Sequence, residues 1–397
     1  MTNLISPDNV WPVWALIAVG TALCIYLEQT RRWAARISGP VLALLIGMFL
    51  SNLRIMPASA PAYDLVDDYL VPVAIPLLLF RANLARILRE AGPMLLAFHI
   101  AATGTVLGAF FAALIFRGDF QHVPEVAGIM TGSYTGGAVN FVAIKDSYNL
   151  SENLTNPLLV ADNFIMAGMF AALLIMAGSR FFRRHYPHPH SLQGDREDVA
   201  ALAARHWRPK EISLLDIAKA VAIAFAVAGL ATMIAGALKA GIESKILQSV
   251  LTNRYVWITF LTVAATTIFH RRMEKIQGAE DLGMYLLYLF FFVIGLRADL
   301  VEVVRNVPVL FSFCLVMALV NLAFTLAVGR LLRVNLEELL LTVNATLGGP
   351  PSAAAMAISR GWSNLVLPAL LAGIWGYVIG TFLGILVAET LRKLFAG

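Results

Sequence analysis

The sequence predicts an all-α polytopic membrane protein built from two inverted six-element repeats. Of its 397 residues, 59% are hydrophobic and only 14% are charged, against roughly 25% charged residues in soluble domains. Apolar runs long enough to cross a bilayer recur along the chain, and three sequence landmarks occur in the same order in both halves. Each repeat is expected to hold five membrane-crossing helices and one discontinuous or re-entrant element.

Ten apolar runs are predicted to cross the membrane as helices, because lipid offers backbone groups no water to bond. Two more segments, 123–150 and 336–361, are apolar but interrupted by glycine or proline. The ten crossing runs are 11–28, 39–53, 64–80, 93–116, 154–178, 213–236, 254–270, 282–297, 307–332 and 364–391.

One sizeable polar stretch, 179–212, separates the first repeat (11–178) from the second (213–392). It is rich in arginine and histidine, and we interpret it as a basic cytoplasmic linker. Its histidines could bind a metal, but a solvated basic loop is the expectation. The net charge of +5 does not indicate nucleic acid, because Lys and Arg lie between apolar runs. Cys24 and Cys314 are expected to be buried packing thiols.

The internal repeat rests on three landmarks at nearly constant offsets of 216, 212 and 211 residues. Asn83 and its counterpart Asp299 are also expected to cap the helices that follow them. The matching segments are Arg81-Ala82-Asn83-Leu84 with Arg297-Ala298-Asp299-Leu300, Thr135-Gly136-Gly137 with Leu347-Gly348-Gly349, and Pro157-Leu158-Leu159-Val160-Ala161 with Pro368-Ala369-Leu370-Leu371-Ala372.

The distribution of Lys and Arg favours inversion of the second copy. If all twelve segments cross and the N-terminus is inside, 17 basic residues fall inside and 13 outside. If the interrupted segments instead leave on the side they entered and the N-terminus is outside, 20 fall inside and 10 outside. The second arrangement obeys the positive-inside rule better. Each repeat then crosses five times, and the misfits are Lys239, Lys245, Arg254, Arg392 and Lys393.

The interrupted segments are the candidate solute site. Paired glycines favour non-helical backbone, and two prolines remove two amide donors. A half-helix that starts after a break directs free N–H groups at an anion, and carbonyls before it suit a cation. Tight helix packing through small residues is the alternative. The candidate substrate-binding residues are Ser133, Tyr134, Thr135, Gly136, Gly137, Asn140, Asn344, Thr346, Gly348, Gly349 and Ser352.

Asp162 is the leading candidate for ion coupling, because a carboxylate within a membrane helix is costly and usually marks an ion or proton path. A helix-end carboxylate near water is the alternative. Asn163 and Asn156 could add oxygens to a cation site. His99 and Asn321 are expected to make interhelical hydrogen bonds.

Charged residues at the ends of the interrupted segments allow two interpretations. Lys145 and Asp146 end the first segment, and Arg360 ends the second. They could attract a carboxylate substrate, or they could be snorkelling residues at the interface.

The landmarks and both interrupted segments resemble the domain-of-unknown-function 819 family of membrane proteins, over almost the whole chain. The matching stretches are Ser133-Tyr134-Thr135-Gly136-Gly137-Ala138-Val139-Asn140 and Leu347-Gly348-Gly349-Pro350-Pro351-Ser352-Ala353. That family resembles the sodium–bile-acid, sodium–glutamate and sodium–citrate symporters and the cation antiporters. The resemblance implies inverted repeats, two discontinuous elements that meet near mid-membrane, and alternating access.

The expected function is cation-coupled symport of a small organic anion, with a sodium/proton-type antiporter as the alternative. The coupling ion is Na⁺ or H⁺, and no other cofactor is expected. The chain has no HExxH or GxSxG motif, so an enzyme is not expected, and neither is a channel. The expected location is the plasma (inner) membrane, with lipid and an anionic solute as partners. A homodimer remains an option.

Overall fold

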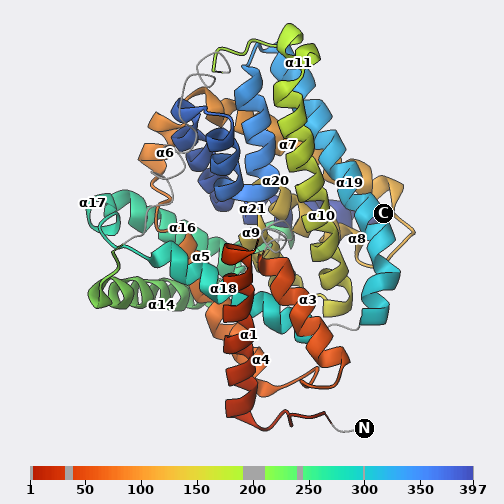
Figure 1. Ribbon diagram of the computed structural model, residues 1–397, viewed down its shortest axis with the longest axis vertical. Helices are drawn as coiled ribbons and strands as arrows, with labels where there is room; N and C mark the ends of the chain where they lie inside the picture. The colour runs from red at the N-terminus through yellow and green to blue at the C-terminus, as the bar shows by residue number, and fades with distance from the viewer. Residues whose placement is uncertain (1–2, 32–38, 191–210, 239–244, 298–299, 397) are drawn as a thin grey trace.

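The computed structural model describes residues 3–31, 39–190, 211–238, 245–297 and 300–396, and this part of the chain is helical with no strand (Figure 1). In chain order the elements are α1 (Val10–Thr30), α3 (Gly39–Asn52), α4 (Pro61–Leu65), the π-helix η1 (Val66–Leu70), α5 (Val71–Leu78), α6 (Leu84–Glu90), α7 (Pro93–Ile115), α8 (Val123–Gly136), α9 (Ala138–Tyr148), α10 (Glu152–Gly178), α11 (Arg180–His185), α14 (Leu214–Ala237), α15 (Lys245–Leu251), α16 (Arg254–Ile268), α17 (His270–Met273), α18 (Ala279–Leu296), α19 (Leu300–Leu331), α20 (Leu336–Ser359) and α21 (Ser363–Ala396).

Seven helices of the described residues are long and apolar enough to cross a membrane: α1, α7, α10, α14, α18, α19 and α21. The helices α3 and α16 are shorter and apolar. These elements confirm the prediction of an all-α polytopic membrane protein. The predicted run 64–80 falls on α4, η1 and α5, which follow one another in continuous right-handed helical backbone, so η1 is a π-helical turn within one helical stretch. Pro72 at the start of α5 and Pro76 inside it supply no amide donor to this stretch.

Local sequence signals set several helix boundaries. The Asn83 side chain accepts a hydrogen bond from the Arg86 amide at 3.2 Å and caps α6, as expected. Its counterpart Asp299 lies outside the described residues. Ser213 and Asp216 form a capping box at the start of α14. Most of the linker, 191–210, also lies outside the described residues. Among the residues that are described, no group of His, Cys, Asp and Glu side chains is placed to hold a metal ion.

The helices gather into two bundles (Figure 1). One, called here the scaffold bundle, contains α1, α3, α4, η1, α5, α14, α16 and α18. The other, called the hairpin bundle, contains α7, α8, α9, α10, α19, α20 and α21. Cys24 in the first and Cys314 in the second are both fully buried free thiols, as expected.

The elements α8 and α9 form a hairpin that lies against α21. A Cβ built on Gly132 of α8 would meet the side chains of Asn140 and Ile144 in α9, so the two helices run back along one another. Glu125, at the start of α8, bonds Arg392 at 2.6 Å, and Tyr148, at the end of α9, lies beside the same guanidinium. Both ends of this first hairpin therefore lie at the C-terminal end of α21.

The helix α20 also turns back, because its backbone is non-helical at Gly349. Across that break, the side-chain amide of Asn344, before it, donates a hydrogen bond to the backbone carbonyl of Ser352, after it, at 2.8 Å. At the start of α20, the Leu336 amide donates to the Pro187 carbonyl, and just after its end, the Arg360 guanidinium donates to the Leu174 carbonyl. Both ends of this second hairpin therefore lie near the C-terminal end of α10.

Small residues let α8 pack closely on α21. A Cβ on Gly376 of α21 would collide with the backbone of Thr135 and Gly136, and one on Gly128 of α8 would collide with the Gly384 carbonyl. The same principle brings α7 against α19, where a Cβ on Gly108 would lie 2.8 Å from the Met317 carbonyl oxygen. Close backbone approach through small residues is typical of membrane helix interfaces.

The close packing predicts that substitution of glycine by alanine destabilises the protein at some positions and not at others. Gly376→Ala is expected to lower the free energy of unfolding by about 1–3 kcal/mol, the usual cost of overpacking. Gly168→Ala in α10 is the matched control, because a Cβ there meets nothing within 4 Å. Unfolding in a graded series of SDS concentrations, followed by circular dichroism, measures both variants. Equal stabilities would contradict the packing argument.

Candidate functional site

The two backbone breaks have nearly the same geometry. Gly137, between α8 and α9, has φ 74° and ψ −168°, and Gly349 in α20 has φ 73° and ψ −174°. A positive φ of this size is accessible to glycine but strained for other residues. Both breaks lie at the glycine pairs where the sequence predicted them, because paired glycines are a local signal.

The breaks also lie side by side. A Cβ built on Gly137 would stand 3.8 Å from the Cα of Gly349, and the Tyr377 ring of α21 borders both glycines. The tips of the two hairpins therefore meet inside the hairpin bundle. The first hairpin has its ends at the C-terminal end of α21, and the second has its ends near the C-terminal end of α10. The backbone groups that the breaks release are covered by protein, which is where a membrane protein tolerates them.

The two half-helices that follow the breaks offer different donors. At the start of α9, the Asn140 and Phe141 amides bond the Gly137 carbonyl, so the amides of Ala138 and Val139 precede the first internal bond of the helix. The half-helix after Gly349 begins with Pro350 and Pro351, which have no amide hydrogen. An anion at the tips would therefore find free N–H groups mainly at α9.

Several predicted binding residues stabilise the hairpins. The Asn140 side chain donates to the Gly376 carbonyl at 3.3 Å and accepts from the Thr381 hydroxyl at 2.7 Å, so it ties α9 to α21. The Asn344 side chain also accepts from the Ser352 hydroxyl at 3.2 Å, across the second break. Gly136 packs on α21, and Gly348 lies beside Ser352 and Met166.

Asp162 is buried in α10, with 7% of its surface exposed. The Ser133 hydroxyl of α8 donates to its Oδ2 atom at 2.7 Å, while its Oδ1 atom is buried without a hydrogen-bond partner. The Tyr134 hydroxyl and the Cys314 thiol of α19 lie close to this carboxyl. The structure thus brings Asp162 together with the predicted residues Ser133 and Tyr134.

The other predicted coupling residues point elsewhere. The Asn156 amide donates to the Ile294 carbonyl of α18 at 3.1 Å, which joins α10 to the scaffold bundle. The Asn163 amide donates to the Leu159 carbonyl of its own helix at 2.8 Å.

A buried polar network that sequence analysis missed connects the two hairpins. Thr105 of α7 donates to the Tyr134 carbonyl at 2.7 Å. Asn321 of α19 donates to the Thr105 hydroxyl at 2.7 Å and lies 3.5 Å from the Thr346 hydroxyl of α20. Asn321 makes the interhelical bond expected of it, and His99 does so by accepting from the Trp375 indole at 3.1 Å. A lone threonine such as Thr105 gives no sequence signal for this role.

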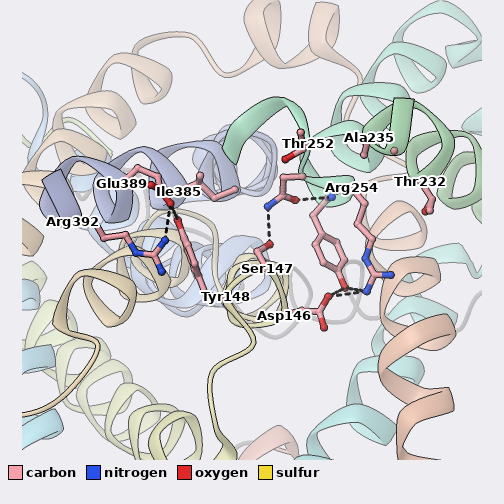
Figure 2. A pocket seen from close by; sticks show the side chains of 13 residues that line it. Asp146, Ser147, Tyr148, Thr232, Ala235, Thr252, Arg254, Ile385, Glu389 and Arg392 are labelled. Atoms are coloured by element: carbon pink, nitrogen blue, oxygen red, sulfur yellow. Dashed lines mark hydrogen bonds and ion pairs between the residues drawn. The ribbon is translucent and has the colours of Figure 1, made fainter. Parts of the chain in front are cut away.

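A crevice of about 590 Å³ opens where the first hairpin ends, between α9 and α21 of the hairpin bundle and α14, α16 and the turn before α16 (Figure 2). Figure 2 shows Tyr148, Glu389 and Arg392 on one side, and Asp146 and Arg254 on the other. The residues that line it are Asp146, Ser147, Tyr148, Thr232, Ala235, Gly236, Thr252, Asn253, Arg254, Tyr255, Ile385, Glu389 and Arg392.

Polar side chains in this crevice join the two bundles. Asp146 of α9 accepts from Arg254 and from the Tyr255 hydroxyl of α16, both at 2.7 Å. The Asn253 amide donates to the Ser147 hydroxyl at 2.7 Å. These five residues connect the hairpin bundle to the scaffold bundle. Asp146, predicted as a substrate attractor or a snorkelling residue, has an intramolecular partner instead.

A second polar connection begins at the neighbouring residue. Lys145 of α9 bonds Glu152 of α10 at 2.7 Å, and Glu152 lies 3.7 Å from Arg297, at the end of α18. Arg297 in turn bonds Asp64 of α4 at 2.8 Å. This chain also runs from the hairpin bundle to the scaffold bundle, at the same end of the molecule.

The second hairpin lacks this chemistry. At the 212-residue offset, the counterparts of Lys145 and Asp146 are Ala357 and Ile358. Within the described residues, Arg360 instead bonds the Leu174 carbonyl of its own bundle. Polar attachment of a hairpin to the scaffold bundle is therefore a property of the first hairpin.

The Asp146–Arg254 pair should be measurable by a double-mutant cycle. Both side chains are a little over a quarter exposed, so solvent screening limits the pair. We expect Asp146→Asn and Arg254→Gln to show a coupling free energy of about 1 kcal/mol, at the upper end for partly exposed pairs. SDS unfolding of both single variants and the double variant measures it. Strict additivity would contradict a direct interaction.

Comparison with known proteins assigns the sequence to a family but not to an activity. A family model described as "Protein of unknown function (DUF819)" matches residues 15–394. The chain is 40% identical, over 385 residues, to the uncharacterized membrane protein YjcL of Bacillus subtilis (strain 168). The match covers 97% of each chain.

Proposed function

The chain belongs to the DUF819 family, and we propose from its own residues that it is a secondary active transporter that works by alternating access. In this proposal it carries a small organic anion in symport with a cation. The observation that carries it is the meeting of two buried backbone breaks, Gly137 beside Gly349. Paired discontinuities in corresponding positions of two repeats are the best pointer to a transporter site.

We infer that the two halves are inverted copies of one six-element repeat. The breaks share their dihedral angles within about 6° of one another. The hairpins approach each other from opposite ends of α10 and α21, and the fourth elements, α7 and α19, cross at the centre through Thr105 and Asn321. These two residues stand 216 residues apart, the offset of the first landmark.

The proposed solute site lies between the hairpin tips and the middle of α10. On the other side of the tips α21 packs without room for a Cβ at Gly376 or Gly380, so the proposed site is placed on the side of α10. The free amides of α9 suit a carboxylate there. Asp162 faces the same hairpin through Ser133 and would carry the coupling ion.

The two bundles provide the moving parts of the proposal. In alternating access, one bundle rocks against another around a fixed site. The hairpin bundle holds both tips, Asp162 and the network between the hairpins. It is joined to the scaffold bundle mainly at the end where the first hairpin opens. The proposed setting is the plasma (inner) membrane, with the linker 179–212 in the cytoplasm.

Ligand binding tests the function. We expect one of succinate, citrate, glutamate, pyruvate or glycylglycine to raise the melting temperature of the purified protein, because a ligand at one hundred times its Kd stabilises the folded state by about 2.7 kcal/mol. Gly137→Ala and Gly349→Ala should abolish this rise. Each places a Cβ at the tips and costs about 1–3 kcal/mol, because a positive φ with ψ near 180° is accessible essentially only to glycine.

Gly229→Ala in α14 is the matched control, because a Cβ there meets nothing within 4 Å. It should keep the ligand-dependent rise. If the tip variants respond to the solute as the unmodified protein does, the tips are not the site.

The inverted architecture predicts opposite exposure of the two hairpin ends. Asn149 follows the first hairpin, Arg333 precedes the second, and both are exposed. A single cysteine at position 149 should react with an impermeant maleimide added to intact cells, whereas one at 333 should react only after permeabilisation. The native Cys24 and Cys314 are fully buried and should not react with the maleimide. Labelling of both sites from one side would refute the inversion.

A further inference from the structure

We propose that the ion carried at Asp162 is a proton, so that its carboxyl is a proton-carrying site and not a Na⁺ site. This inference rests on the proposed transport function and names its coupling ion. In each cycle one proton would pass from water at one membrane face to the carboxyl and return to water at the other face. The covalent bonds of the protein stay unchanged apart from that O–H bond.

The neighbours of the carboxyl are hydrogen-bond donors. The Ser133 hydroxyl donates to Oδ2 at 2.7 Å. The other titratable groups beside it are the Tyr134 phenol of α8 and the Cys314 thiol of α19. In the part of the chain that the structure describes, no charged side chain of α3, α18, α19 or α20 acts on this carboxyl. An ionised carboxylate would be buried there without a counter-charge, which is costly, whereas a neutral acid is not.

A Na⁺ ion would need several oxygen ligands around one point, such as carbonyls of unwound backbone. The buried oxygens near this region that lack partners belong to Tyr134, Thr135, Asn156 and Asn321. The Tyr134 hydroxyl lies beside the carboxyl, and helix geometry separates the other three from Asp162. Asn156 precedes Asp162 by six residues, so its side chain points about 240° around α10 and bonds α18.

The remaining two oxygens are also displaced. Thr135 is two residues from Ser133, which turns it about 160° away around α8. Asn321 is seven residues beyond Cys314, two turns or about 10 Å along α19. Among the described residues, Oδ1 and the Tyr134 hydroxyl are thus the only unpartnered oxygens at this point, which is too few for a Na⁺ ion, whereas a single proton needs only the Oδ1 atom.

Hydrogen bonds connect this proton site to the hairpin tip. Ser133 bonds Asp162 through its side chain, and its carbonyl accepts from the Gly137 amide at 2.6 Å. Gain or loss of the proton changes whether the carboxyl accepts or donates toward Ser133, one turn from the break. The occupancy of Asp162 and the shape of the tip are thereby linked.

Infrared difference spectroscopy of the full-length protein in nanodiscs tests the inference without any solute. A pH step should produce a carboxylic-acid C=O stretching band that Asp162→Asn removes. Asp162→Glu should move that band rather than abolish it, which covers the case in which the asparagine variant folds poorly. Asp119→Asn is the matched control, because Asp119 is exposed between α7 and α8, and it should keep the band.

A second measurement compares the infrared spectrum in KCl with the spectrum in NaCl at constant pH. We expect the Asp162 band to follow pH and to be the same in both salts. The inference is wrong if the band disappears on addition of Na⁺. It is also wrong if no band that depends on Asp162 is seen at any pH. A protein that fails to bind or transport any solute but keeps a titrating Asp162 band would refute the transport function and leave the proton site standing.

Discussion

Backbone polar groups cannot be left unpaired in hydrocarbon, and the hairpin bundle is arranged around that constraint. Each hairpin breaks its helix at a glycine with positive φ, and each break is covered by the other. The contact is possible because neither Gly137 nor Gly349 has a side chain at the point of approach. The small residues of α21 then let α8 lie close enough to enclose the first tip. A larger residue at any of these positions would expose the freed peptide groups or strain the break.

The two hairpins share geometry but differ in chemistry. The first keeps its amide donors after the break and carries Lys145 and Asp146 at its far end. The second replaces the donors with Pro350 and Pro351 and the charges with Ala357 and Ile358. One hairpin therefore contributes polar contacts and attachment to the scaffold bundle, while the other contributes mainly a shaped backbone. The two ends of the hairpin bundle therefore differ in chemistry.

The sequence predicted features that depend on residue type at one place in the chain. Breaks at glycine pairs, a buried carboxylate and the existence of apolar helices are all of this kind. It could not predict partners far apart in the chain, such as Asp146 with Arg254 or Thr105 with Asn321, because polarity does not specify which residue it pairs with. The π-helical turn η1 within the run 64–80 was not predicted, because hydropathy does not distinguish a π-helical turn from α-helix.

Two exceptions to the charge rule have a structural explanation. Arg254 and Arg392 were misfits in the predicted topology, since they would lie on the side that disfavours basic residues. Both are paired in the structure, Arg254 with Asp146 and Arg392 with Glu125 and Glu389. Both guanidiniums are therefore part of the folded helix contacts and not free in a loop, and it is basic residues of short loops that the positive-inside rule concerns.

The helix α10 is the element through which a change at Asp162 can reach both bundles. Its first turn is attached to α18 through Glu152 and Asn156, and its middle contacts the first hairpin through Ser133. One turn further on, Met166 lies beside Gly348 of the second hairpin. A change in charge at Asp162 therefore acts on a helix that touches both tips and is fixed at one end to the scaffold bundle. In the proposed cycle, the coupling ion can shift the equilibrium between the two states only through contacts that differ between them, and a residue at this junction has such contacts with both bundles within reach.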